Sequence, residues 1–171
     1  MNLKKFHFKK ITSTNEKAIK LLRAGHKNGI IIADNQTKGK GRYGKKWISL
    51  KGNLLMSVFF KIKKEQKIIN INKTNLKLIQ KVLQRFSNKK IRIKYPNDLL
   101  INKKKLCGIL QETLFMEDSK FLIVGIGVNI QNYPKIANYP TTSLNLYTIK
   151  KINKSIVSKY IKRAYEKIIS I

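Results

Sequence analysis

Apolar positions in the chain either alternate with polar ones or follow one another in short runs, and both patterns predict strands. Residues 3–8 alternate, as in a strand with one buried face. Residues 54–60 are almost continuously apolar, which indicates that a strand at 53–62 is covered on both faces. Five further stretches have strand character and are bounded by turn residues: 29–33, 91–95, 99–101, 105–115 and 120–130.

Apolar residues at helical spacing predict three helices. Ser13, Thr14, Asn15 and Glu16 have the pattern of a capping box, which would open a first helix that stops near Gly25. A second helix is expected at residues 74–86, and a third runs to the C-terminus. The side chains expected to face inward are Ala18, Leu21 and Leu22, then Leu76, Ile79, Leu83 and Phe86, and finally Ile156, Val157, Tyr160, Ala164 and Ile168.

The elements follow in the order strand, helix, strand, loop, strand, helix, several strands and a last helix. This order predicts an α+β fold, in which a mixed, largely antiparallel sheet is backed by helices. The length of 171 residues suits one domain with a proper core, and no repeat, low-complexity segment or linker interrupts the chain. We therefore expect a single domain over residues 1–171.

The charge of the chain is strongly unbalanced, with 38 basic and 8 acidic residues and a net charge of +30. Such a balance raises the question of nucleic-acid binding. The lysines, however, are spread over almost every segment and are not gathered on one element. The chain is also rich in Asn and Ile, which share A/T-rich codons with Lys, so we interpret much of the charge as codon bias on solvent-exposed faces.

Residues that usually form disulfides or bind metals are scarce. The single Cys107 excludes an internal disulfide and a cysteine-based zinc site, and its apolar neighbours predict a buried thiol. His7 and His26 lie far apart in the sequence and lack neighbours of metal-ligand type, so no metal site is expected. No apolar run is long enough to cross a bilayer, and the N-terminus lacks a signal-peptide hydrophobic region, which predicts a cytoplasmic protein without membrane association.

The stretch from Gln36 to Trp47 combines glycines with basic residues and is the main candidate for a binding site. Its glycines are Gly39, Gly41 and Gly44, and its basic residues are Lys40, Arg42, Lys45 and Lys46. Glycine lets backbone N–H groups approach a ligand, and arginine can grip phosphate or carboxylate with two parallel bonds. A solvated basic loop is the alternative interpretation. Trp47 is expected to pack beneath the loop.

Other candidate residues lie at the ends of predicted elements. Asp98, in the Pro-Asn-Asp turn at 96–98, is one of only eight carboxylates, and Lys105 begins a strand that would hold its amine rigidly. Gly108 marks a bulge or a close approach inside that strand. Gly125 and Gly127 share a strand face, where they leave room for something flat or bulky or else mark a close crossing. Each of these residues also has an ordinary structural interpretation as a turn, surface or packing residue.

Taken together, these motifs resemble the catalytic domain of the biotin–protein ligase family (biotin–acetyl-CoA-carboxylase ligases). Each motif alone is weak, but their common order and spacing are specific, and they run from Ser13 to about Leu144. The matching stretches are Ser13-Thr14-Asn15, Gln36 with residues 39–44 and Trp47, Lys94-Tyr95-Pro96-Asn97-Asp98, residues 105–110 with Glu112, and residues 125–129.

The resemblance implies a class II synthetase-like fold and a reaction in two steps. Biotin, as substrate, would be activated with ATP and Mg²⁺ to biotinyl-5′-AMP, and then transferred to a lysine of the biotin carboxyl carrier protein of acetyl-CoA carboxylase. Such chemistry needs fixed positive charge and positioning more than a protein nucleophile. By the family pattern Arg42 would hold the phosphate, Lys105 would bridge carboxylate and phosphate, and Asp98 would orient or deprotonate the incoming lysine.

The resemblance also implies two sets of binding residues. The biotin set is Ser13, Thr14, Asn15, Gln36, Lys40, Gly41, Arg42, Lys105 and Gly108. The ATP and adenylate set is Gly39, Arg42, Gly44, Trp47, Asn97, Lys105, Gly127 and Asn129. Mg²⁺ would be held through the phosphates of ATP and not by a protein metal site.

The chain departs from the family pattern in three places. Lys40 stands where arginine is usual, and Tyr95 stands where tryptophan is usual. The sequence ends after the last predicted helix, so we expect neither the small C-terminal β-barrel domain of many members nor an N-terminal helix-turn-helix. Repression of an operon, a second role of some relatives, is therefore not expected.

Two rival functions remain open from the sequence. A lipoate–protein ligase or octanoyltransferase resembles the same fold and also modifies a lysine. A basic nucleic-acid-binding protein would need aromatic residues interleaved with basic ones on one face, and it does not explain the glycines. We expect no specific nucleic-acid partner, and the residues leave a homodimer open.

Overall fold

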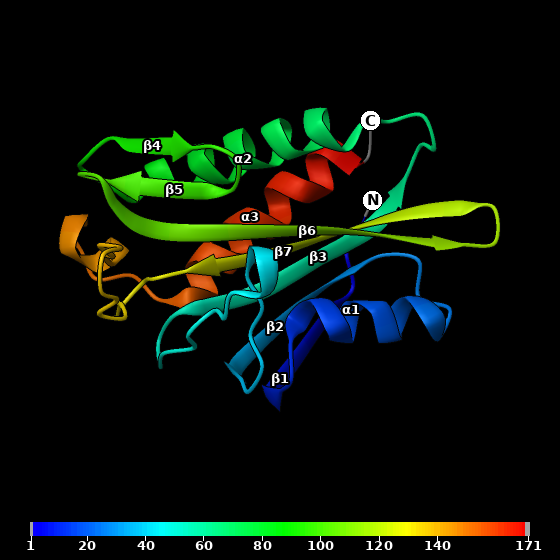
Figure 1. Cartoon of the computed structure of the whole chain (residues 1–171), viewed down its shortest axis with the longest axis horizontal. Coiled ribbons are helices and arrows are strands. Elements are labelled where there is room, and N and C mark those ends of the chain that lie inside the picture. Colours follow the sequence, from blue (N-terminus) through cyan, green and yellow to red (C-terminus); the bar gives the residue numbers. More distant parts are fainter. Residues whose placement is uncertain (1, 170–171) are drawn as a thin grey trace.

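Seven strands of the computed structural model, which describes residues 2–169, form one sheet in the order β1-β2-β3-β7-β6-β5-β4 (Figure 1). The strands are β1 Lys5–Ile11, β2 Gly29–Gln36, β3 Leu54–Ile62, β4 Ile91–Lys94, β5 Asp98–Ile101, β6 Lys104–Met116 and β7 Ser119–Val128. The β1–β2 pair is parallel, and the other five neighbouring pairs are antiparallel. The predicted mixed, largely antiparallel sheet is confirmed.

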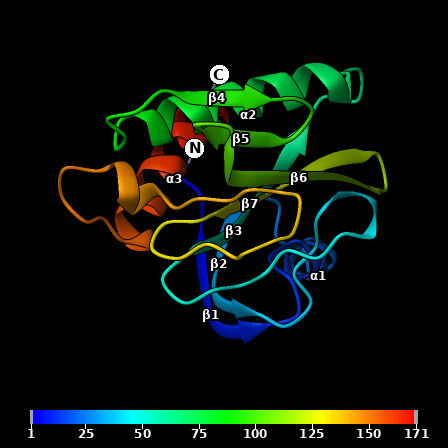
Figure 2. The ribbon, with the colours of Figure 1, turned by 60° about the vertical axis from the view of Figure 1, so that its left-hand side comes forward.

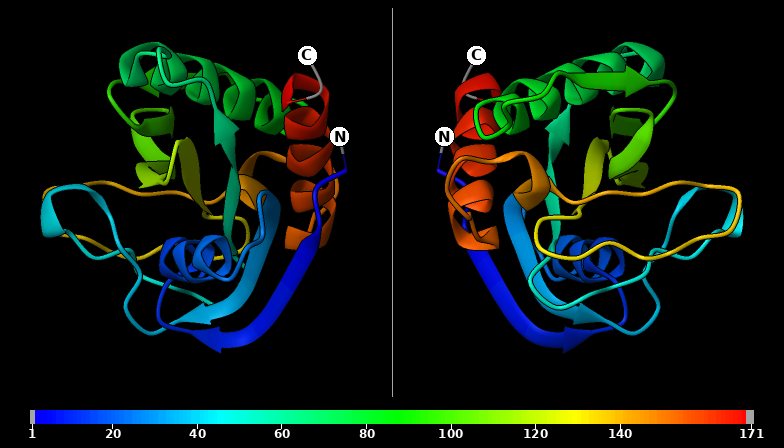
Figure 3. Two further views of the ribbon diagram at one scale, coloured as in Figure 1. Left: turned by 90° about the vertical axis from the view of Figure 1, so that its right-hand side faces the viewer. Right: turned by 90° about the vertical axis from the view of Figure 1, so that its left-hand side faces the viewer.

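Three α-helices cover the two faces of this sheet. They are α1 Thr14–Arg23, α2 Ile68–Gln84 and α3 Lys154–Ile169. The larger core packs α2 and α3 against one face, and a smaller core packs α1 against the other (Figure 3). Strand β3 serves both cores, because Val58 belongs to the larger one and Phe59 to the smaller one. This explains its nearly unbroken apolar run.

The start of α1 differs from the predicted capping box. Ser13 is the N-cap residue, but its side chain makes no capping hydrogen bond. Instead, the backbone N–H of Thr14 donates to Oε1 of Gln36 at 2.7 Å, and Glu16 pairs with Lys40 at 2.8 Å. The acceptor that satisfies this helix end therefore comes from the end of β2. The first turn of α1 is tied in this way to the start of the glycine-rich loop.

Several element boundaries were predicted wrongly. Strand β2 continues beyond Ala33, because Asn35 and Gln36 still pair with β1. Helix α2 begins at Ile68 and not at residue 74; after its first residue, Ile69 and Asn70 are exposed, and Ile71 is partly buried against the larger core. In α3 the fully buried positions are Val157, Ile161 and Tyr165, while Ile156 and Ile168, which were expected inside, are exposed.

The structure shows the surroundings of Cys107 and the length and hydropathy of the helices. Cys107 is fully buried, and burial raises the pKa of its thiol, which confirms a structural role. Among residues 2–169, no helix combines the length and hydropathy needed to cross a membrane.

Candidate functional site

A cavity of about 980 Å³ opens on the face of the sheet that carries α1. Its walls include parts of two irregular segments, residues 37–53 after β2 and residues 129–143 after β7. Figures 2 and 3 show both segments, in cyan and in yellow to orange, projecting from the sheet on the α1 side. A cavity of this size and with mixed polarity suits a small organic ligand.

Almost all residues that the sequence predicted for the site lie around this one cavity. They are Ser13, Thr14, Asn15, Gln36, Lys40, Gly41, Arg42, Trp47, Asn97, Asp98, Lys105, Gly108, Gly127 and Asn129. Gly39 and Gly44, predicted to bind the adenylate, do not line it. A Cβ at Gly39 would lie 2.6 Å from the carbonyl oxygen of Trp47, and Gly44 has a φ of +72°. Both glycines are therefore explained by the backbone of the loop.

The centre of the cavity holds an ion pair that the sequence did not predict as a pair. Nζ of Lys105 lies 2.8 Å from Oδ1 of Asp98, and both side chains are largely buried. The contact is an ion pair more than an aligned hydrogen bond, because Oδ1 has no donor in bonding geometry among the described residues. The hydroxyl of Tyr139 donates to the other oxygen of Asp98 at 2.5 Å. Asp98 is therefore held from both sides.

A β-bulge brings Lys105 to this position. Leu99 pairs with Cys107 and Leu100 pairs with Lys105, so Leu106 is an extra residue on β6. Leu106 and Cys107 both face the larger core, although side chains of a regular strand alternate. The extra residue turns Lys105 to the side of Gly108, where its Nζ lies 3.4 Å from the place of a Cβ. The bulge thus lies two residues before the glycine that had suggested it.

The flat group above the β6 and β7 glycines is the indole of Trp47. A Cβ at Gly108 would lie 2.8 Å from the ring, and one at Gly127 would overlap it. Nζ of Lys105 lies 5.6 Å from the ring centroid. The indole Nε1 is buried and has no hydrogen-bond partner among the described residues. Trp47 therefore packs beneath the loop, as predicted, and also leaves a donor free in the cavity wall.

Asn15 anchors the floor of the site. Its amide nitrogen donates to Glu112 at 2.6 Å and to the carbonyl of Leu110 at 3.3 Å, and its oxygen accepts from Ser57 at 2.5 Å. A Cβ at Gly125 would lie 2.5 Å from that oxygen, so this glycine makes room for the anchor. With its polar atoms satisfied by the protein, Asn15 fixes the first turn of α1 against β3 and β6.

The glycine-rich loop holds its charges in different ways. The N–H of Gly41 donates to the carbonyl of Lys45 at 2.7 Å, which closes a tight turn around Tyr43. Lys40 is paired with Glu16, whose carboxylate raises the pKa of the Lys40 amine, while the hydrogen bond from Lys40 lowers the pKa of Glu16. Arg42 donates to the hydroxyl of Tyr43 at 2.9 Å and stacks on its ring. Its guanidinium is thus held by an exposed aromatic residue.

Sequence reasoning missed the wall formed by residues 134–141, in which Tyr139 is the main polar residue. Burial, followed by the hydrogen bond to Asp98, raises the pKa of the Tyr139 phenol. A long irregular segment with two prolines is a general sign of a functional loop. Nothing in its residue pattern indicated contact with Asp98.

The asparagines predicted for the site have partners in the backbone and core. The carbonyl of Asn97 accepts from the N–H of Ile109 at 2.9 Å, and Oδ1 of Asn129 accepts from Asn53 at 3.3 Å. Within residues 2–169, no group of three or more His, Cys, Asp or Glu side chains could hold a metal ion.

Comparison with known sequences points to one family. Residues 6–129 match the family described as biotin/lipoate A/B protein ligase. The chain is 33 % identical over 172 residues to the bifunctional ligase/repressor BirA of Bacillus subtilis, covering 92 % of this chain and 51 % of that protein. It is 32 % identical over 123 residues to BirA of Escherichia coli, covering 70 % of this chain and 38 % of that protein. The chain thus spans about half the length, or less, of these curated relatives.

Solved structures give the same result. A biotin protein ligase from Leishmania major in complex with biotinyl-5-AMP has a TM-score of 0.84 and 26 % identity, covering 98 % of this chain and 75 % of that one. A biotin protein ligase from Aquifex aeolicus in complex with biotin and ATP has a TM-score of 0.80 and 27 % identity, covering 96 % of this chain and 69 % of that one. The sheet and helices described above are therefore similar to those of proteins solved with these ligands.

Proposed function

The chain belongs to the biotin/lipoate A/B protein ligase family, and on that premise we propose that it is an ATP-dependent biotin–protein ligase. In the first step a carboxylate oxygen of biotin attacks the α-phosphorus of ATP, the bond from that phosphorus to pyrophosphate breaks, and biotinyl-5′-AMP forms. In the second step the amine of a carrier lysine attacks the acyl carbon and AMP leaves.

The placement of Lys105 carries this proposal. Its ammonium group is fixed by a bulge on β6, beside Asp98 and under the ring of Trp47. Adenylate formation develops negative charge on phosphate and carboxylate oxygens, and a cation fixed beforehand stabilises that charge without reorganisation. Arg42 would add a second cation by leaving Tyr43 when the loop closes over the ligand.

The two sides of the cavity suit the two halves of the adenylate. On the β2 side, Ser13, Thr14 and Gln36 offer hydroxyl and amide groups, which favour the polar ring of biotin over the apolar ends of lipoate or octanoate. On the β5 side, Asn97 offers an amide, and Gly127 and Asn129 lie at the end of β7. We assign the nucleotide to that side, with the Trp47 indole between the two halves.

Asp98 would act in the second step. Once the adenylate phosphate competes for Lys105, a carboxylate oxygen of Asp98 becomes available to orient the incoming lysine or to accept its proton. The proposed partner is the biotin carboxyl carrier protein of acetyl-CoA carboxylase, and the proposed location is the cytoplasm. We assign the described domain to the catalytic domain of such a ligase.

Mg²⁺ would come with the phosphates of ATP and neutralise part of their charge. Asp98 is the one carboxylate among the described residues that line the cavity, and it is already paired with Lys105. The chain therefore offers the ion the amide oxygens of Asn97 and Asn129, which suits a metal held mainly by a substrate.

The proposal is tested by exchange of labelled pyrophosphate into ATP with biotin, lipoate or octanoate as the only acid. We expect exchange with biotin alone. Exchange with lipoate or octanoate but not with biotin would assign the chain to the other branch of the family. A folded protein that exchanges with none of the three acids would refute acid activation altogether.

A further inference from the structure

Behind the site, on the sheet face that carries α2 and α3, four hydrogen bonds form one continuous chain. The Tyr165 hydroxyl donates to Oδ1 of Asn75 at 2.9 Å, and Nδ2 of Asn75 donates to Oε1 of Gln111 at 2.7 Å. Nε2 of Gln111 donates to Oδ1 of Asn72 at 2.5 Å, and Nδ2 of Asn72 donates to the carbonyl oxygen of Pro96 at 2.9 Å. The chain thus joins α3, α2 and β6 to the turn that precedes β5.

This chain of hydrogen bonds ends at the carbonyl oxygen of Pro96, and that acceptor fixes the direction of every bond in the chain. A backbone carbonyl can only accept, so Asn72 must present its nitrogen to Pro96 and its oxygen to Gln111. Gln111 must then present its oxygen to Asn75, which leaves the Asn75 oxygen for the Tyr165 hydroxyl. Bonds aligned in one direction polarise one another, so the chain is stiffer than four separate contacts.

The need to satisfy buried polar atoms does not explain the part of this hydrogen-bond chain that is nearest to Pro96. Tyr165 and Asn75 are buried and need each other. Asn72 and Gln111 are only partly buried and could use water, yet they extend the chain to Pro96. The next residues, Asn97 and Asp98, line the cavity. The turn that carries the site carboxylate is therefore held from behind by polar side chains.

We propose that Asn72 and Gln111 are positioning residues for the adenylation site, acting through the carbonyl of Pro96. They hold residues 96–98 where Asp98 meets Lys105 and where Asn97 can face the nucleotide. The expected effect on catalysis rests on the proposed function, whereas the restraint of residues 96–98 by Asn72 and Gln111 does not. Without Asn72 the turn loses this restraint from α2, so the bond from the Ile109 amide to the carbonyl of Asn97 should open more often.

Two substitutions at position 72 and one matched control test the inference. Asn72→Asp keeps the size and the acceptor for Gln111 but removes the donor to Pro96. Asn72→Ala removes both bonds without adding charge. Asn70→Asp adds the same charge to the same helix at an exposed position, where the side chain has no hydrogen-bond partner within residues 2–169. Circular dichroism establishes that each variant is folded.

The first readout is biotin-dependent pyrophosphate exchange, analysed as kcat and KM. We expect both Asn72 variants to lose roughly tenfold or more in kcat, because a small misplacement of a site group is costly. KM for biotin should stay within about twofold of the parent value, since the proposed biotin residues lie on the β2 side. Asn70→Asp should behave like the parent. A kcat within about twofold of the parent in both Asn72 variants would overturn the inference.

The second readout does not depend on activity. It is the hydrogen exchange of the Ile109 amide, which donates to the carbonyl of Asn97. We expect lower protection of this amide in Asn72→Ala and parental protection in Asn70→Asp. If the parent shows no pyrophosphate exchange, the proposed function fails, and the Ile109 amide alone decides this inference. Unchanged protection in Asn72→Ala would then overturn it.

Discussion

At the scale of single residues, the site depends on one cation and one carboxylate that neutralise each other before any ligand arrives. Lys105 and Asp98 lie 2.8 Å apart, and Tyr139 occupies the second carboxylate oxygen. A largely buried charge is tolerated when it is paired and hydrogen-bonded. The same pair keeps the ammonium group of Lys105 on a rigid strand at the place where we propose that phosphate charge develops.

Lys105→Ala should slow adenylation by about 10²–10³-fold and also weaken the fold. Loss of the fixed cation removes about 2.7–4 kcal/mol of transition-state stabilisation, judged from other oxyanion sites. Loss of the partner of Asp98 leaves a buried carboxylate short of one contact, at a cost of about 1–3 kcal/mol. Pyrophosphate exchange and urea unfolding measure the two effects separately.

The double variant Lys105→Ala with Asp98→Asn is the control for that prediction. The neutral amide needs no cation, so most of the lost stability should return while pyrophosphate exchange stays as low as in Lys105→Ala. Equal stability of the single variant and the parent, or recovery of exchange in the double variant, would contradict the role of the pair.

Arg42→Gly should make an enzyme that releases its adenylate. The guanidinium of Arg42 contacts the exposed side chain of Tyr43, and this solvent-exposed contact can be exchanged for one to a phosphate when the loop closes. Its loss should weaken retention of biotinyl-AMP more than binding of biotin. The measurement is biotin attachment to an unrelated lysine-rich protein, which we expect to rise several-fold over the parent.

Arg42→Lys is the matched control, because it keeps the charge without the planar guanidinium group. Its labelling of the bystander protein should fall between that of the parent and that of Arg42→Gly. If Arg42→Gly makes adenylate but labels the bystander no more than the parent does, Arg42 is not the retaining group. If it makes no adenylate, Arg42 acts earlier, in ATP binding.

Among the secondary-structure elements, the spacing of apolar and turn residues predicted each strand and each α-helix described above, but not every boundary and neither 3-10 helix, Arg42–Gly44 and Leu144–Tyr147. The first turns of α2 were missed because exposed Ile69 and polar neighbours surround the partly buried Ile71, which leaves only a weak inward spacing of apolar residues. The end of β2 was interpreted as a turn because it carries Asp34 and Asn35, although Asn35 pairs with β1. The local preference of a polar residue does not show whether it will pair with a neighbouring strand or contact a neighbouring helix.

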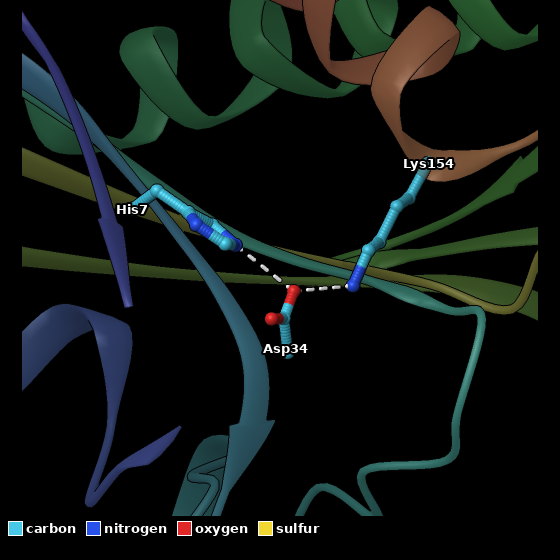
Figure 4. A network of polar contacts seen from close by, with 3 residues as sticks. All are labelled: His7, Asp34 and Lys154. Carbon is cyan, nitrogen blue, oxygen red and sulfur yellow. Dashed lines mark hydrogen bonds and ion pairs between the residues drawn. The ribbon is translucent and has the colours of Figure 1, made fainter. Parts of the chain in front are cut away.

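The partner that keeps Asp34 in place comes from the far end of the chain. Oδ1 of Asp34 on β2 accepts from Lys154 of α3 at 2.6 Å and lies 2.9 Å from Nε2 of His7 on β1 (Figure 4). The hydrogen bond from Lys154, followed by that from His7, lowers the pKa of the Asp34 carboxyl. This contact ties the start of the last helix to the edge of the sheet.

Asp34→Asn should lower stability slightly at neutral pH and not at all in acid. A carboxyl with a lowered pKa stabilises the fold above its unfolded pKa of about 3.9, and that contribution is lost as pH falls through the lowered value. Because the group is partly exposed, we expect at most about 0.5–1 kcal/mol. Urea unfolding at neutral pH and at low pH should give a difference that disappears in acid.

Asp118→Asn is the matched control, because the Asp118 pair with Lys64 is exposed and should contribute nothing measurable. An Asp34→Asn difference that persists unchanged at low pH would contradict the assignment of the effect to this carboxylate.

In the molecule as a whole, five of the eight acidic residues form ion pairs with lysines. Glu16 pairs with Lys40, Asp34 with Lys154, Asp98 with Lys105, Asp118 with Lys64 and Glu166 with Lys162. Most of the 38 basic residues are therefore left without an acidic partner, because the chain has only 8 acidic residues. Such a surface attracts polyanions without selecting among them.

Binding to nucleic acid should therefore be nonspecific and sensitive to salt. Affinity for unrelated DNA duplexes should be similar and should fall steeply between about 50 and 200 mM salt, as counterion release requires. A gel-shift series with two duplexes at several salt concentrations measures this. Strong preference for one duplex at physiological salt would support a specific nucleic-acid function instead.

Most residues that the sequence predicted for the site line one cavity, but the sequence did not show how that cavity is assembled. The order of motifs located all but two of the predicted residues around one cavity, because family motifs mark where strands and loops end. It did not reveal the Lys105–Asp98 pair, the bulge at Leu106 or Tyr139, since each depends on contacts between segments distant in sequence. Nor did it reveal the chain from Tyr165 to Pro96, whose residues match no motif.

If this chain activates biotin and passes it to a carrier lysine, a carrier domain should become biotinylated in its presence. The most direct measurement is mass spectrometry of a biotin carboxyl carrier domain after incubation with the 171-residue protein, biotin and Mg-ATP. We expect one biotinyl group on one lysine, formed by the parent protein and far more slowly by Lys105→Ala with Asp98→Asn. A carrier that stays unmodified, or that gains a group only when lipoate replaces biotin, would contradict it.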